Sequence, residues 1–451
     1  MPHQEYYKML SPEFKYTRAF CTEDDITMAK SIKKFVDKEI MPHRQDLEGG
    51  WHKDQKLALE TQHELYAKLS DLGVTKSNLP AEYGGLGLSP VVRQMVNEEI
   101  SRGDIGLGTM VGKLHWIVSF MLAAKRDDLL KEFAGRIVGK DSWTACVAIT
   151  EPGGGANLED PGQQYRTIRT IAKEDGDDYV INGHKLWPGP SGPAESFQSK
   201  HLKGHLGYWL VATTDPEKGE EGVGLFHIPP DAKGLTFGKP YEKMGFCWAD
   251  QNTDIYLDDV RIPKKYRIDV EPGQGANLVR GYVIGLGRLA GAARLVGLSQ
   301  AVLEIVLNST KHREIVGMPQ RERSLFANHI GEMYRYIDVA RQYYLSVTWQ
   351  VMNPAIYGDH WSHEMIAKYS AARSFSGDCA NFVCNRGMEM MGSYGYSYEF
   401  NLEKYMRDYK ISQMWLGGAQ RDRLDIAQGL YGPFTWGGYN EWSKKQTLKA
   451  G

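Results

Sequence analysis

Residues 407–420 of this chain read RDYKISQMWLGGAQ, which is the most informative stretch of the sequence. Four other stretches stand ahead of it: LPAEYGGLGLS at residues 79–89, TEPGGGAN at 150–157, YVINGHKLW at 179–187 and MGSYGY at 391–396. Any one of these strings is too short to be specific. Five of them in a fixed order along one chain are a specific signal.

Together these stretches resemble the motifs of the acyl-CoA dehydrogenase family, whose closing motif reads R-D-A-K-I-x-Q-I-Y-E-G-T. The resemblance covers residues 22–429. It implies an α+β fold of three parts: an N-terminal helical domain at residues 1–142, a central antiparallel β-domain at 143–265, and a C-terminal four-helix bundle with a C-terminal arm at 266–451. It also implies a flavoenzyme that uses FAD and acts on an acyl-CoA thioester.

The composition is that of an ordinary globular protein. The chain has 451 residues, of which 42% are hydrophobic and 24% charged, and its net charge of −2 gives no electrostatic reason to expect nucleic acid as a partner. Five scattered cysteines show neither metal-ligand spacing nor a disulfide framework. We find no signal peptide and expect no membrane span. These features favour a bacterial cytoplasmic protein, and the mitochondrial matrix stays open as an alternative.

Local sequence patterns agree with the three parts. Residues 22–140 have helical periodicity, with Asp24 and Asp25 placed as N-cap residues, and residues 98–122 have the length of one helix. Residues 143–262 alternate short apolar runs with turn residues, as in a β-domain. Residues 285–297 crowd glycine and alanine into an apolar helix. Because glycine weakens a helix, we expect this one to pack closely against another helix or the flavin.

The resemblance assigns the flavin ring to the start of the β-domain. Val147, Ile149 and Thr150 match family positions that hydrogen-bond the isoalloxazine through the backbone and the threonine. Trp187 matches the tryptophan that stacks on the ring, with a core tryptophan as the alternative. The next residues are PGP at 188–190 where the family has Ile-Thr-Asn, so the usual threonine contact to the flavin is missing.

A second group of matches concerns the FAD diphosphate. Arg313 matches a family arginine that binds the diphosphate of a neighbouring subunit, which suits a guanidinium fork. Glu389 replaces a glutamine there, and an acid beside a diphosphate is unfavourable unless it is turned away. Gly392 and Ser393 offer backbone N–H groups, and Gln420 matches a polar position near FAD. Because the site would need two chains, we expect a homotetramer, or at least a dimer.

The substrate positions show the main departure from the family. They correspond to Ala156, Arg288, Trp415, Leu416 and Gly417, although a buried structural role for Arg288 is equally open. Leu416 stands where the family usually has the glutamate that removes the α-proton, and a leucine accepts no proton.

The base must therefore come from elsewhere in the chain. The other family position for a catalytic glutamate, immediately before Arg288, is occupied by Gly287. Relatives that act on alicyclic CoA thioesters place an aspartate on the helix near residue 104, so Asp104 is our candidate base. A solvated or capping Asp104 is the alternative.

These matches predict an FAD-dependent oxidoreductase that acts on the CH–CH group of an acyl-CoA with an alicyclic or otherwise unusual acyl group. Electrons would pass to an electron-transferring flavoprotein or a similar acceptor. Two alternatives stay open. One is the same fold with changed chemistry, as a flavin monooxygenase, reductase or eliminase. The other is a non-catalytic member that binds flavin or CoA.

Overall fold

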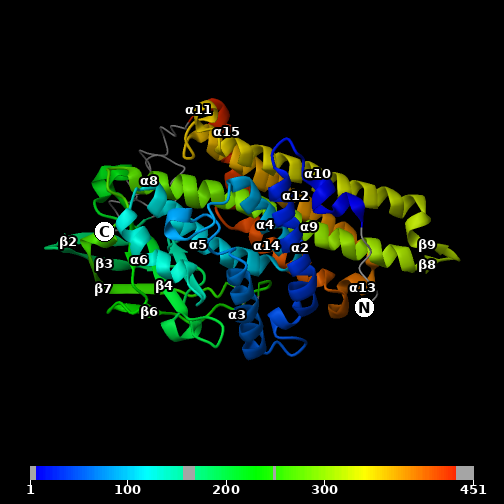
Figure 1. Ribbon diagram of the computed structural model, residues 1–451, viewed down its shortest axis with the longest axis horizontal. Helices are drawn as coiled ribbons and strands as arrows, with labels where there is room; N and C mark the ends of the chain where they lie inside the picture. The colour runs from blue at the N-terminus through cyan, green and yellow to red at the C-terminus, as the bar shows by residue number, and fades with distance from the viewer. Residues whose placement is uncertain (1–6, 156–167, 247–249, 433–451) are drawn as a thin grey trace.

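The computed structural model describes residues 7–155, 168–246 and 250–432. A β-sheet lies at one end of the molecule, and long helices run from it toward the opposite end, where a short hairpin, β8 and β9, projects (Figure 1). Shorter N-terminal helices pack along the middle. Along the chain, helical segments thus come before and after the strands of the sheet, as the motifs predicted.

The N-terminal part is helical, with two local corrections. Thr22, rather than Asp24 or Asp25, is the N-cap of the first long helix, and Asp25 closes a capping box with it. The predicted helix at residues 98–122 is broken at Asp104, whose extended backbone ends one helix and caps the next. The helices are α1 (Pro12–Lys15), α2 (Glu23–Phe35), α3 (Gln55–Asp71), α4 (Pro90–Gly103), α5 (Ile105–Ala123) and α6 (Asp127–Val138).

The central part is a seven-stranded sheet in the order β1-β4-β2-β3-β7-β6, with β5 paired to β4. The prediction of an antiparallel sheet is only partly right, because β1 and β2 both run parallel to β4. Parallel neighbours need long connections, which residues 149–203 provide. The strands are β1 (Trp143–Ala148), β2 (Ile171–Asp175), β3 (Asp178–Lys185), β4 (Gly204–Thr213), β5 (Val223–Ile228), β6 (Leu235–Phe237) and β7 (Ile255–Pro263).

The C-terminal part is the predicted helical bundle, in which α12 packs against α9, α10 and α15. Its elements are α8 (Gln274–Leu278), α9 (Leu286–His312), β8 (Glu314–Ile315), β9 (Met318–Pro319), α10 (Ser324–Val351), α11 (Pro354–Tyr357), α12 (His363–Met391), α13 (Ser393–Tyr396), α14 (Leu402–Met414) and α15 (Gly418–Tyr431). A π-helical turn, η9 (Val279–Gly285), joins α8 to α9. The exact boundaries between the three parts stay a prediction.

Helix α9 is in direct backbone contact with α4, as its small residues predicted. A Cβ atom at Gly297 would lie 2.1 Å from the carbonyl oxygen of Glu98 and 3.1 Å from the backbone nitrogen of Arg102. Backbone atoms inside a packed helix cannot move aside as a flexible side chain can. Only glycine therefore allows the two helices to approach this closely.

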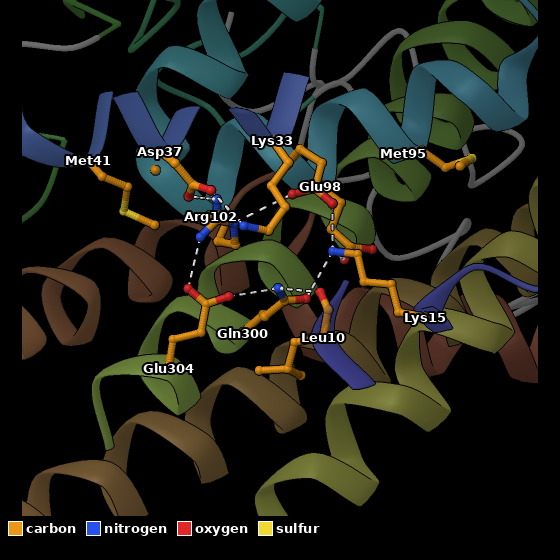
Figure 2. Close-up of polar contacts among 12 residues, drawn as sticks. Leu10, Lys15, Lys33, Asp37, Met41, Met95, Glu98, Arg102, Gln300 and Glu304 are labelled. Atoms are coloured by element: carbon orange, nitrogen blue, oxygen red, sulfur yellow. Dashed lines mark hydrogen bonds and ion pairs between the residues drawn. The ribbon is translucent and has the colours of Figure 1, made fainter. Parts of the chain in front are cut away.

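Buried charges join the same two helices to the rest of the bundle (Figure 2). Glu98 on α4 accepts from Lys15 at 2.8 Å and from Arg341 of α10 at 3.0 Å. Arg102, one turn further along α4, donates to Glu304 of α9 at 2.8 Å. All five side chains are at most slightly exposed. Removing one member of such a buried group leaves an uncompensated charge, which costs about 3–5 kcal/mol.

Two helical stretches, Ile105–Ala123 and Gln274–His312, are long and apolar enough to cross a membrane by length and composition. The sequence analysis did not anticipate apolar stretches of this length, although it expected no membrane span. The protein itself buries 83% and 94% of their most apolar windows, so both are core helices of this fold.

We predict that Gly297→Ala destabilises the protein by at least about 1–3 kcal/mol, because the added methyl group has no space between two backbones. Gly331→Ala on α10 is the matched control, since a Cβ there meets nothing within 4 Å. In that control alanine should be neutral or stabilising by up to about 1 kcal/mol. Chemical denaturation of both variants measures the difference. Equal stability of the two variants would contradict the proposed contact.

Candidate flavin and substrate site

A cavity of about 570 Å³ lies where the sheet meets the helices. One wall comes from the strand side and includes Val147, Ile149, Thr150 and Trp187. The other comes from helices α5, α9 and α14 and from the loop after α14. The described lining residues on that helical side include Thr109, Lys113, Trp116, Arg294, Ile411, Met414, Trp415, Leu416 and Gly417. The structure thus gathers in one cavity seven residues that the sequence analysis assigned to flavin or substrate.

The strand wall offers an aromatic surface. Trp187 has a left-handed backbone conformation, with φ of 66°, and its side chain is 37% exposed. The amide of Asn252 donates to its carbonyl at 2.9 Å, and its ring lies 4.3 Å from that of Tyr241. The alternative of a fully buried core tryptophan is therefore excluded. An exposed ring beside Ile149 and Thr150 is the surface on which a flat ring system can stack.

Two arginines, one on α9 and one on α12, hold the loop after α14 in place. Arg288 on α9 donates to the carbonyl of Leu416 at 2.9 and 3.1 Å, and Arg373 on α12 donates to the carbonyl of Trp415 at 2.6 Å. Leu416 itself has φ of 53°, a conformation that a leucine adopts at a cost. The two guanidinium groups fix this conformation and turn the leucine side chain toward the cavity wall.

Arg288 does not line the cavity, so its predicted contact with substrate is not what the structure shows. Its side chain is fully buried, and it forms ion pairs with Asp425 at 2.6 Å and Asp422 at 3.2 Å. The alternative of a buried structural arginine describes it correctly. Through its two bonds to the carbonyl of Leu416, Arg288 contacts the Leu416 loop from inside the bundle.

Asp104 also lies outside the cavity, contrary to the role predicted for it. One carboxylate oxygen caps α5 by accepting from the backbone of Leu107 at 2.8 Å. The other pairs with Lys404 of α14 at 2.7 Å. Burial alone would lower the pKa of Lys404, but Asp104 and Asp408 outweigh burial and raise it well above its ordinary value. Asp104 is thus a capping residue and a structural counter-ion in this arrangement.

Sequence reasoning missed the charged residues of the cavity. Among its described lining residues are three cations, Lys113, Lys243 and Arg294, and one carboxylate, Asp250. Lys113 and Asp250 lie 3.6 Å apart, and Lys243 donates to the carbonyl of Asp250 at 2.9 Å. Lys113 could have been found from the sequence, because it is the only Lys, Arg, Asp or Glu of the otherwise apolar helix α5.

Arg313 directly precedes β8, which projects at the end of the bundle opposite the sheet (Figure 1). Arg313 follows α9, donates to the carbonyl of Met391 at 3.0 Å and lies over the ring of Tyr394. This contact brings it beside Gly392 and Ser393. Glu389 is exposed and pairs with Arg386 at 2.7 Å. Its charge is therefore balanced within the same helix.

Two other residues predicted to contact FAD or substrate belong neither to the cavity nor to the residues around Arg313. Gln420 is exposed near the start of α15 and does not line the cavity. Ala156 lies outside the described residues.

Three family models match this chain in order. The acyl-CoA dehydrogenase N-terminal domain matches residues 22–133, the middle domain 146–260 and the C-terminal domain 273–431. The chain belongs to the acyl-CoA dehydrogenase family. It is a flavoenzyme with FAD as cofactor and acyl-CoA as substrate class, an oxidoreductase acting on CH–CH groups, as predicted.

The sequence matches to known relatives extend over almost the whole length of this chain. Cyclohexane-1-carbonyl-CoA dehydrogenase of Syntrophus aciditrophicus is 27% identical, with 91% of this chain and 97% of the relative covered. The mitochondrial short-chain specific acyl-CoA dehydrogenase of Rattus norvegicus is 26% identical, with 89% of each covered. The structure of a glutaryl-coenzyme A dehydrogenase with glutaryl-CoA superposes with a TM-score of 0.76 at 23% identity, covering 92% of this chain and 96% of that one. That last likeness shows the fold.

The described residues fit FAD at two places. Trp187 offers an exposed ring in the cavity, where the isoalloxazine would stack. Arg313 and the Gly392 turn offer a guanidinium and a left-handed glycine, which suit a diphosphate. FAD would supply the acceptor for the hydride, and the remaining cavity wall must bind and orient the thioester.

Proposed function

We propose that this protein oxidises the α,β-carbon bond of a CoA thioester with a compact, alicyclic acyl group. The observation that carries the proposal is the cavity, which joins the flavin-stacking wall at Trp187 to an acyl wall closed by Leu416. An apolar side chain at this position gives a ring-shaped acyl group a surface to pack on. The 27% identity to a cyclohexane-1-carbonyl-CoA dehydrogenase supports the same substrate class.

We further propose Asp250 as the proton acceptor in place of Asp104. Asp250 is the carboxylate among the described residues that line the cavity, and its side chain is 5% exposed. The ammonium group of Lys113 lies 3.6 Å from the carboxylate and would hold it in place in the cavity. Leu416 cannot perform this step, and Asp104 is held by Lys404 and by the start of α5.

The oligomer and the electron acceptor are part of the same proposal. Arg313 and the turn at Gly392 lie toward the end of the bundle opposite the sheet, which suits contact with the FAD of a neighbouring copy (Figure 1). This supports a homotetramer, or at least a dimer. An electron-transferring flavoprotein is the acceptor we propose, and the cytoplasm is the compartment.

The two alternatives of the sequence analysis predict different outcomes with the same protein. A flavin monooxygenase would reoxidise its reduced flavin rapidly with oxygen. A non-catalytic member would bind CoA thioesters tightly and leave the flavin oxidised. The placement of Asp250 in the cavity favours the dehydrogenase over both.

Anaerobic titration of the FAD-loaded protein with acyl-CoA thioesters tests the function. We expect cyclohexane-1-carbonyl-CoA to bleach the visible flavin absorbance at a lower concentration than a long straight-chain thioester. The reason is that the cavity wall at Leu416 is apolar, which gives a ring-shaped acyl group a surface to pack on. A flavin that stays oxidised with every thioester would refute the proposal.

The acid–base assignment is tested by two matched amide variants. Asp250→Asn should keep thioester binding but slow flavin reduction by roughly 10²–10⁴-fold, the usual contribution of a positioned base. Asp104→Asn should instead lower the unfolding temperature, because Lys404 loses one of its two buried acidic partners, and should leave the reduction rate of bound thioester near that of the parent. Single-turnover kinetics separate the two effects. A reversed pattern would restore Asp104 as the base.

The role of Arg313 is tested by FAD retention. Arg313→Ala should lose FAD more readily on gel filtration, because a charge-assisted contact to the diphosphate disappears. Arg335→Ala on the exposed face of α10 is the control and should retain FAD. Sedimentation of the parent protein should show at least a dimer. A monomer with full flavin occupancy would contradict a shared site.

A further inference from the structure

The helical wall of the cavity contains a guanidinium group whose burial is not explained by its protein contacts. Arg294 of α9 is 3% exposed, and its Nε has no hydrogen-bond partner among the described residues. Burial lowers its pKa to about 10, and Asp250 only partly opposes this effect. Taking a cation out of water costs several kcal/mol unless a partner compensates it.

The neighbouring helix is shaped to accept this side chain. A Cβ atom at Gly112 of α5 would lie 2.4 Å from a terminal nitrogen of Arg294, so the glycine leaves the space that the guanidinium occupies. The next residue, Lys113, is 7% exposed and lines the same cavity, where its ammonium group lies 5.0 Å above the ring of Trp116. Two buried cations on adjacent helices therefore converge on one part of the cavity.

The carboxylate of Asp250 does not account for both cations. It forms an ion pair with the Lys113 ammonium at 3.6 Å, longer than a hydrogen bond. A third cation, Lys243, lies close by and donates to the backbone carbonyl of Asp250 and to the side chain of Asn252. The described lining residues thus hold more positive than negative charge. A second anion that enters with the ligand would restore the balance.

We propose that the acyl group of the substrate carries a carboxylate, which binds between Arg294 and Lys113. This rests on the proposed function and narrows its substrate class to CoA monothioesters of dicarboxylic acids with a compact or ring-shaped chain. The flavin would occupy the wall at Trp187, so the helical wall is the surface left for the acyl group. Arg294 is then a specificity-determining residue.

Matched pairs of thioesters test this inference in the unmodified protein. The pairs are 4-carboxycyclohexane-1-carbonyl-CoA with cyclohexane-1-carbonyl-CoA, and glutaryl-CoA with pentanoyl-CoA. The phosphates of CoA are the same within each pair, so they cancel in the comparison. We expect the carboxylate member to bind roughly ten- to a hundredfold more tightly in at least the ring pair. Binding of the neutral member as tightly or more tightly in both pairs would overturn the inference.

Substitutions then test whether Arg294 causes the preference for the carboxylate member of each pair. Arg294→Met keeps most of the volume and should abolish the preference for the carboxylate member, whereas Arg294→Lys should retain part of it. Arg93→Met is the matched control, because Arg93 is a half-buried arginine whose pKa burial also lowers to about 10, and it lines a different cavity. It should leave the preference unchanged. An equal loss in both methionine variants would show a general structural effect and overturn the assignment.

The two levels of the proposal fail in distinguishable ways. If no CoA thioester of either pair binds or reduces the flavin, the proposed function itself fails. If the neutral members reduce the flavin and binding shows no preference for the carboxylate, the function stands and only the carboxylate site is refuted. If Arg294→Met does not fold, the paired comparison in the parent protein decides the question alone.

Discussion

The close contact of α9 with α4 is the constraint on which the rest of the structure depends. Gly297 brings the two backbones together, and the buried charges around Glu98 and Arg102 fix their orientation (Figure 2). Helix α9 places Arg288 at the Leu416 loop and Arg294 at the cavity, and Arg313 directly follows its last residue. A shift of this one helix would displace three arginines that serve three different parts of the molecule.

The cavity combines an apolar closing loop with charged side chains from other elements. The closing loop, which usually supplies a glutamate, here presents Leu416 in a left-handed conformation held by Arg288. Charged groups stand instead on other elements, with Lys113 on α5, Arg294 on α9 and Asp250 before β7. A leucine accepts no proton, so the role that the motif gives to this position cannot be carried over to this chain.

The fold and the flavin wall were predictable because their signals are local strings. Trp187, Ile149 and Thr150 lie in motifs that are continuous in sequence, and they meet in the cavity. Asp250 and Arg294 lie outside any motif, and only the tertiary structure brings them together. Asp104 was misplaced for a related reason, since a helix position does not reveal that Lys404, three hundred residues later, holds its carboxylate.

That ion pair has a consequence for motion. Asp104 caps the first turn of α5 and binds α14, and the cavity takes lining residues from both helices. Local opening of α14 would therefore have to break a buried ion pair and uncap α5, so the two helices should exchange their amide hydrogens as one cooperative unit.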